Sequence, residues 1–216
     1  MTVRCGAHRA GANALPRRLR RPFAAVLAAA AFLSFALAAH AAWIPVKAQL
    51  AQWLIARSWE AGLQRGAAPP PWPWADTRPV ALLEAPAQGV RLFVLEGNSG
   101  RNLAFGPVFS DGTALGRDMV INGHRDTHFD FLQALRPGDR VRLQRGVASA
   151  WYVVTQTEVV DSRTQDLVID PGLDRVSLVT CFPFDSPTAG GPLRYVVTAL
   201  PANRRGFSSR SSPSSG

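Results

Sequence analysis

Val176-Ser177-Leu178-Val179-Thr180-Cys181 is a run of apolar and β-branched residues that ends in a thiol. Such a run predicts a β-strand, and Phe182-Pro183 directly after it takes the chain out of the sheet. Similar short runs, separated by turn residues, recur over 78–201, with one short helix expected at 128–135. The other runs cover residues 79–83, 90–95, 119–122, 140–143, 151–160 and 195–200. About seven or eight short strands indicate an all-β fold, a closed or nearly closed barrel, because closure removes exposed strand edges.

The composition supports one folded domain with additional terminal segments. Of the 216 residues, 47% are hydrophobic and 18% are charged. That is enough apolar material for a core, and it excludes a wholly disordered chain. The two cysteines are too few for a disulfide-stapled scaffold or for a four-thiolate zinc site.

The net charge of +9 is carried by the two ends of the chain. Residues 1–21 contain six arginines and no acid, and residues 202–216 contain three arginines and no acid. The body between them, residues 22–201, has fifteen basic and fifteen acidic side chains. A nucleic-acid site needs a basic face on the folded body, so we expect no nucleic-acid partner.

Residues 22–44 are a candidate membrane anchor. The apolar stretch runs from Phe23 to Ile44, 22 residues interrupted only by His40, and about 20 such residues span a bilayer as a helix. The basic segment before it, residues 1–21, predicts a cytoplasmic N-terminus, with residues 45–216 outside the cytoplasm. A cleaved signal peptide is the alternative, since Ala39-His40-Ala41 fits a small-x-small cleavage pattern.

This topology separates the two cysteines. Cys5 would be cytoplasmic and Cys181 external, so they are not expected to form a disulfide with each other. Cys181 would then be an unpaired thiol in an oxidising compartment. Such a thiol is either buried and inert or retained for its reactivity, and its position alone does not separate the two.

Residues 45–77 are expected to connect the anchor to the barrel. Residues 45–65 contain good helix formers and predict a juxtamembrane helix. The Pro- and Trp-rich stretch 69–74 predicts a stiff spacer, in preference to a recognition ligand for a proline-binding domain. Residues 202–216 are rich in serine and predict a disordered tail.

Three reactive side chains stand at the ends of predicted strands. Cys181 ends one strand, His124 follows another, and Arg194 begins a third. An imidazolium stabilises a thiolate nucleophile, and a guanidinium can stabilise the oxyanion of acyl transfer. From spacing alone, the same residues also fit an inert buried thiol, a core histidine and a surface arginine.

Three motifs resemble those of the sortase family. Ser177-Leu178-Val179-Thr180-Cys181 is similar to the sortase signature Thr-Leu-x-Thr-Cys, with serine in place of the first threonine. The segment 121–129 resembles the histidine segment of sortases, with His124 at the catalytic position. Leu193-Arg194-Tyr195-Val196 resembles the strand that carries the essential arginine. The surrounding sequence is most similar to the class GN sortases of Gram-negative proteobacteria.

The resemblance implies an eight-stranded sortase β-barrel over residues 78–201 and a membrane-anchored cysteine transpeptidase. It implies that Cys181 cleaves a C-terminal sorting signal in a target protein through a thioester, which an amine acceptor then resolves. His124 would transfer protons and Arg194 would bind the carbonyl or oxyanion, with Thr180 and Asp126 in supporting positions. No cofactor and no metal are implied. The location implied is the inner membrane, as a single-pass protein with its catalytic domain in the periplasm.

Two other functions fit part of the pattern. A zinc hydrolase could use His124, His128 and Cys181, because His-x-x-x-His is a recurring ligand spacing. That spacing places both imidazoles on one face only within a helix, whereas His124 is expected to follow a strand. A catalytically silent, membrane-anchored β-domain is the second alternative. It predicts no thioester and no effect of losing Cys181.

Overall fold

The computed structural model describes residues 17–188 and 190–202. Cys5, most of the basic segment 1–21 and all but the first residue of the serine-rich tail 202–216 lie outside the described residues. By their internal contacts, the residues form two units, Met1–Ala48 and Gln49–Gly216.

One long helix, α1, covers Arg17–Arg65. Its first half is rich in alanine, the best helix former, and the side chains of residues 25–41 are exposed. The part Ala25–Arg65 is long and apolar enough to cross a membrane, judged by length and composition only. Residues 45–65, expected as a separate helix, are the C-terminal part of α1.

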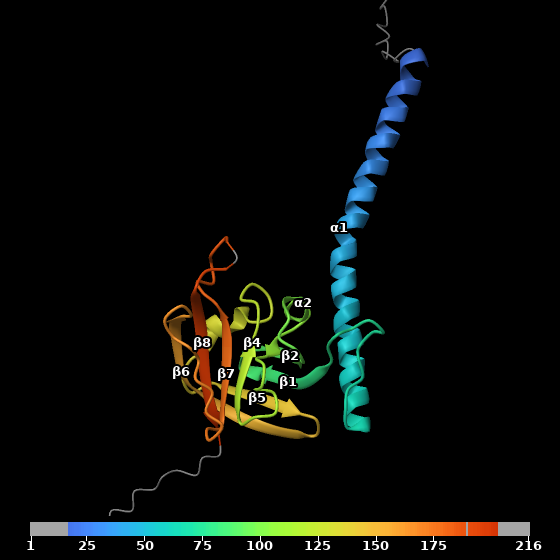
Figure 1. The fold of residues 1–216 in the computed structure, drawn as a ribbon. Helices are drawn as coiled ribbons and strands as arrows, with labels where there is room; N and C mark the ends of the chain where they lie inside the picture. Colours follow the sequence, from blue (N-terminus) through green and yellow to red (C-terminus); the bar gives the residue numbers. More distant parts are fainter. Residues whose placement is uncertain (1–16, 189, 203–216) are drawn as a thin grey trace, which may run out of the picture. The chain divides into compact units, whose positions relative to one another are not determined.

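The second unit contains a closed β-barrel with the strand order β1-β2-β3-β4-β7-β8-β6-β5 (Figure 1). Two 3₁₀ helices, η1 and η2, and one short helix, α2, lie in the connections. The elements are β1 (Pro79–Ala85), η1 (Pro86–Gln88), β2 (Val90–Leu95), α2 (Gly100–Leu103), β3 (Val108–Phe109), β4 (Asp118–Asn122), η2 (Asp130–Ala134), β5 (Arg140–Arg145), β6 (Ala148–Asp161), β7 (Arg175–Cys181) and β8 (Leu193–Pro201).

The predicted all-β barrel of eight strands is confirmed, with two local differences. The helix expected over 128–135 is shorter and is the 3₁₀ helix η2, which ends where Leu135 takes an extended conformation. Strand β3 was not predicted, because its two residues carry no periodic pattern. It exists because Val108 pairs with both Leu95 of β2 and Asn122 of β4, which closes the sheet.

The barrel core follows from the alternation of side chains along each strand. In β7, Val176 and Leu178 belong to the core, and opposite them in β8 lie Ala199 and Val197. Large side chains from the connection between β4 and β5 also enter this core, namely Phe129 and, from η2, Leu132. The fully buried core includes Leu83, Val94, Ile121, Phe129, Leu132, Leu135, Val141, Leu178 and Val197. Each such side chain contributes about 1.5–3 kcal/mol by leaving water, so the barrel interior is the main source of stability.

The Pro- and Trp-rich stretch contacts the barrel. The ring of Trp72 packs edge-on against Phe105, with 5.1 Å between centroids. Both rings border a second small cluster, built from Ile55 of α1, Leu95 of β2 and Val108 of β3. Residues 66–77 are therefore packed on the domain at Trp72.

Candidate active site

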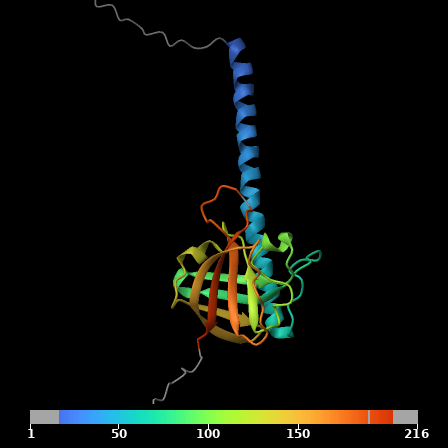
Figure 2. The same ribbon diagram turned by 60° about the vertical axis from the view of Figure 1, so that its left-hand side comes forward.

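Strand β7 lies between β4 and β8 in the sheet. This order brings the C-terminal ends of β4 and β7 and the N-terminal end of β8 together. β4 runs parallel to β7, with Asn122 opposite Val179, so both strands finish at the same end of the barrel. β8 runs antiparallel to β7 and therefore begins at that end, where Arg194 is opposite Cys181. β7 and β8, orange and red, run side by side in Figure 1 and Figure 2. The residues around His124, Cys181 and Arg194 are thus neighbours in space.

Cys181 lies on the outward face of its strand. Val176 and Leu178 point into the core, and alternation puts Cys181 on the opposite face. Its side chain is half-buried and forms no disulfide with another described residue. Residues directly opposite each other in an antiparallel pair have Cβ atoms about 4.5–5.5 Å apart on one face. The Arg194 side chain therefore leaves the sheet beside the thiol.

The backbone before His124 is fastened to β7. Gly123 N donates to Val179 O over 3.1 Å, and Thr180 Oγ1 donates to Gly123 O over 2.7 Å, with Thr180 only 2% exposed. A side chain at Gly123 would lie 2.6 Å from the ring of Phe129, so this position accommodates only glycine. Thr180 therefore acts by holding the segment that carries His124, and the His124 side chain itself is exposed.

The Arg194 guanidinium is anchored to its own loop. Nη1 donates to Gly191 O over 2.7 Å and to Leu193 O over 2.9 Å. Gly191 has a φ of +88°, a conformation that favours glycine, and this lets the loop turn back toward the strand. A guanidinium has five N–H donors, so donors remain that can face a substrate.

Asp126 and Arg125 form an ion pair in the loop after His124. The Arg125 Nε to Asp126 Oδ1 distance is 3.1 Å, and the Asp126 side chain is 65% exposed, whereas that of Arg125 is 4% exposed. Sequence reasoning singled out Asp126 and missed Arg125. The only signal was the position of Arg125, directly after His124, and a lone arginine in a polar stretch ordinarily indicates a surface residue.

His128 is half-buried near His124. Burial, and then the positive charge of His124, lower the pKa of His128 below its ordinary value. Among residues 17–188 and 190–202, no three His, Cys, Asp or Glu side chains cluster closely enough to hold a metal ion. The proposed zinc set of His124, His128 and Cys181 therefore gains no geometric support from the described residues.

Three aromatic rings, from the segment after Cys181 and from the start of β8, pack together. Phe184 meets Tyr195 edge-on at 5.2 Å between centroids, and Phe182 stacks on Tyr195 at 6.2 Å. Phe182 directly follows Cys181, and Tyr195 directly follows Arg194. This aromatic cluster of Phe182, Phe184 and Tyr195 is only partly buried, and Phe184 and Tyr195 also pack against the barrel core. Because side chains alternate along β8, the Tyr195 ring lies on the opposite face of the sheet from Arg194.

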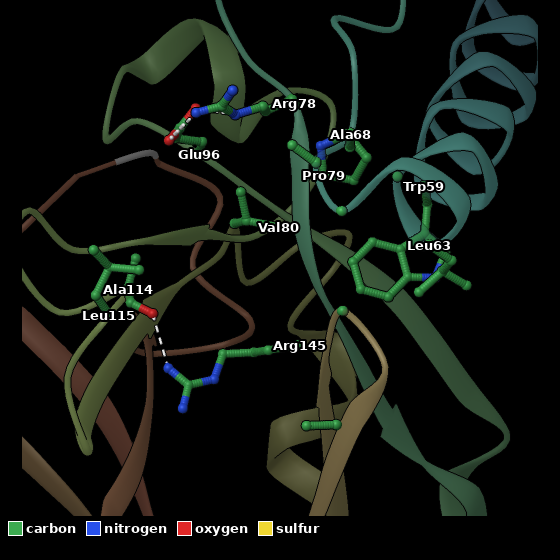
Figure 3. A pocket seen from close by; sticks show the side chains of 15 residues that line it. Trp59, Leu63, Ala68, Arg78, Pro79, Val80, Glu96, Ala114, Leu115 and Arg145 are labelled. Carbon is green, nitrogen blue, oxygen red and sulfur yellow. Dashed lines mark hydrogen bonds and ion pairs between the residues drawn. The ribbon is translucent and has the colours of Figure 1, made fainter.

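An open cavity of about 620 Å³ lies elsewhere on the second unit (Figure 3). It adjoins residues 114–115, which precede β4, whereas His124 follows β4. Arg145 Nη1 donates to Ala114 O over 3.0 Å, and both residues line the cavity (Figure 3). Its lining includes Trp59, Leu63, Pro79, Val80, Leu115 and Arg145. Cys181, His124 and Arg194 do not line it, so the cavity is separate from the candidate active site.

The fold and the site together define a closed eight-stranded barrel with cysteine, histidine and arginine at one end. The sequence model of the sortase domain family matches residues 83–202. This match covers more than half of the chain, which therefore belongs to the sortase family.

Relatives in the same family are similar over the barrel. Sortase D of Bacillus subtilis (strain 168) is 28% identical over 123 residues, which cover 54% of this chain and 60% of that protein. Sortase A from Corynebacterium diphtheriae is similar in structure, with a TM-score of 0.53 and 26% identity over 60% of this chain and 63% of that one. Sortase C1 from Streptococcus suis gives a TM-score of 0.50 and 25% identity over 57% of this chain and 72% of that one. The chain thus spans less than two thirds of the length of the first two relatives.

Proposed function

We propose that this protein is a membrane-anchored cysteine transpeptidase that cleaves a C-terminal sorting signal in a target protein and transfers the target to an amine. One observation carries the proposal: β4, β7 and β8 bring His124, Cys181 and Arg194 to one end of the barrel. Cysteine, histidine and arginine together provide the nucleophile, the proton carrier and the oxyanion donor that acyl transfer needs.

In the acylation step, the Cys181 thiolate attacks the carbonyl carbon of the scissile peptide bond. The electron pair of the C=O bond moves to oxygen, and the Arg194 guanidinium donates hydrogen bonds to that oxyanion. As the oxyanion collapses, the C–N bond breaks, and the His124 imidazolium gives its proton to the departing amine. The products are a thioester on Cys181 and the free C-terminal fragment.

In the second step, an amine acceptor attacks the thioester carbonyl. Neutral His124 takes a proton from the incoming nitrogen, the C–S bond breaks, and the Cys181 thiolate is restored. Water reacts in the same way when no amine is present, and the target protein is then released as an acid. Neither step needs a cofactor or a metal.

The apolar part of α1 supports a single-pass anchor in the inner membrane, and the arginines before it support a periplasmic catalytic domain. We further propose that the protein belongs to the class GN sortases of Gram-negative proteobacteria. The domain organisation that accompanies this proposal is a cytoplasmic segment 1–21, an anchor 22–44, a connection 45–77, a catalytic domain 78–201 and a tail 202–216.

Intact-mass spectrometry of the full chain in detergent tests this function. The substrate is a synthetic peptide with the C-terminal sequence of the protein that the neighbouring gene encodes. We expect an adduct equal to the peptide minus its leaving fragment, located at Cys181, and release of that adduct by hydroxylamine. Cys181→Ala should form no adduct, whereas the matched variant Cys5→Ser should form it at the wild-type rate. If the protein were a catalytically silent β-domain, neither the wild type nor either variant would form an adduct.

A further inference from the structure

One buried side chain joins the two loops that flank the candidate active site. Arg125, in the loop after β4, donates from Nη1 to Pro183 O over 2.7 Å. Its Nη2 donates to Ser186 O over 2.8 Å and to Thr188 O over 2.7 Å. All three acceptors are backbone carbonyls of the loop between β7 and β8, which connects Cys181 to Arg194.

The burial of Arg125 makes this contact strong. Its side chain is 4% exposed, and a buried guanidinium is costly unless its donors are satisfied. Here Nε is satisfied by Asp126 and the two terminal nitrogens by the three carbonyls. Charge-assisted hydrogen bonds of this kind are about twice as strong as neutral ones. The backbone of 183–188 therefore gains partners that the strands of the barrel do not supply.

The two loops depend on Arg125 to different degrees. The segment with His124 has independent supports, because Gly123 is bound to Val179 and Thr180, and Phe129 is fully buried. Among the described residues, the hydrogen bonds that join 183–188 to the rest of the protein come from Arg125, while Phe184 adds packing against Tyr195 and the barrel core. Loss of this side chain should therefore release 183–188 and leave His124 in place.

Resting on the proposed function, we infer that Arg125 is a positioning residue that holds the β7–β8 loop in the conformation that receives the substrate. The loop begins with Phe182 and Phe184 of the aromatic cluster and ends at Arg194. Arg125 thus holds the loop that connects the nucleophile Cys181 to the oxyanion donor Arg194. It acts through this loop and does not itself touch the reacting atoms.

The test compares Arg125→Gln and Arg125→Lys with a matched control, Arg175→Gln. Arg175 is also a largely buried, ion-paired arginine, but it lies at the other end of β7, bound to Asp118. Five quantities are measured for each protein: the melting temperature, kcat/KM with the sorting-signal peptide, the pH profile of that activity, the alkylation rate of Cys181 by iodoacetamide, and amide hydrogen exchange. All rates are taken below the onset of melting.

For Arg125→Gln we expect kcat/KM to fall on the order of ten- to a hundredfold, since a shift of about 1 Å can cost a hundredfold. Amides of 183–188 should exchange faster, while the alkylation rate and the pH profile of activity stay as in the wild type. Arg125→Lys should be intermediate, because an ammonium keeps the charge but lacks the planar fork. Arg175→Gln should lower the melting temperature and leave kcat/KM and loop exchange unchanged.

Three results would overturn the inference. Folded Arg125 variants with wild-type kcat/KM and wild-type loop exchange would make the contact irrelevant to catalysis. An altered alkylation rate or pH profile would show that Arg125 acts on Cys181 and His124 directly. If neither Arg125→Gln nor Arg125→Lys folded, Arg125 would be a residue that the fold itself requires and not a positioning residue of the site. If the wild type forms no thioester, the proposed function fails, and loop exchange still decides whether Arg125 holds the loop.

Discussion

Cys181 and Arg194 are paired directly across the β7–β8 ladder, the last residue of one strand opposite the second residue of the next. Thirteen positions apart in the sequence, they are neighbours in space because the intervening loop reverses the chain. Opposite residues of a ladder share one face of the sheet. The ladder therefore sets the relation between the thiol and the guanidinium, and the loop sets the orientation of the guanidinium.

Arg194→Lys should stay folded and lose most of its turnover. Lysine keeps the positive charge but loses the planar fork of donors, and removing one oxyanion donor costs about 3 kcal/mol, on the order of a hundredfold in rate. We expect an unchanged melting temperature, a lower kcat and little change in KM. The control is Arg163→Lys, an exposed arginine paired with Asp161, which should retain full turnover. Wild-type turnover in folded Arg194→Lys would remove Arg194 from the site.

His128→Ala should retain most of the activity. Burial and the charge of His124 lower the pKa of His128, so at neutral pH this side chain is a neutral imidazole and not the proton donor of the first step. Assays of His128→Ala and of the wild type with a chelator should both give near-normal thioester formation. Activity that a chelator abolishes and zinc restores would instead support the metal hydrolase.

Asp118→Asn should destabilise the barrel in a pH-dependent way. Burial raises the pKa of Asp118, but hydrogen bonds from Arg175 and the Asp170 N–H, with the charge of Arg175, outweigh this and lower the pKa overall. Arg175 Nε and Nη2 contact the two carboxylate oxygens at 2.8 and 2.6 Å. Breaking a buried pair costs on the order of 3 kcal/mol, measurable by urea unfolding at pH 7.

The sign of the pH effect follows from the lowered pKa. A carboxyl whose pKa is depressed on folding stabilises the protein above its unfolded pKa, about 3.9. This contribution is lost as the pH falls from there through the folded pKa. The difference between wild type and Asp118→Asn should therefore be constant from pH 7 to about pH 5 and shrink below about pH 4. A difference that grows in acid would contradict the assignment.

Ser177→Ala should not destabilise the protein. Ser177 is 1% exposed, and its Oγ has no hydrogen-bond partner among the described residues. A buried hydroxyl without a partner costs about 1–3 kcal/mol, so its removal should raise the free energy of unfolding by about 1 kcal/mol after the small loss of packing. Urea denaturation measures this difference. A loss of stability would show that the hydroxyl has a partner.

Much of the barrel could be predicted from local patterns. The runs at 79–83, 90–95 and 176–180 lie within observed strands, because short stretches of apolar and β-branched residues fit a pleated surface that packs on a core. Strand β3 could not be predicted in this way, since two residues carry no period. It forms only because its neighbours β2 and β4 offer partners.

The sequence by itself determined which side chains are available for chemistry and where the strands that carry them begin and end, because apolar alternation and turn residues act over a few neighbouring positions. Only the tertiary structure decided that β4, β7 and β8 are adjacent, which places His124, Cys181 and Arg194 at one end of the barrel. It also decided that Arg125 is buried, with acceptors 58, 61 and 63 residues away. Such contacts depend on how the closed sheet brings distant loops together, and no local sequence pattern indicates them.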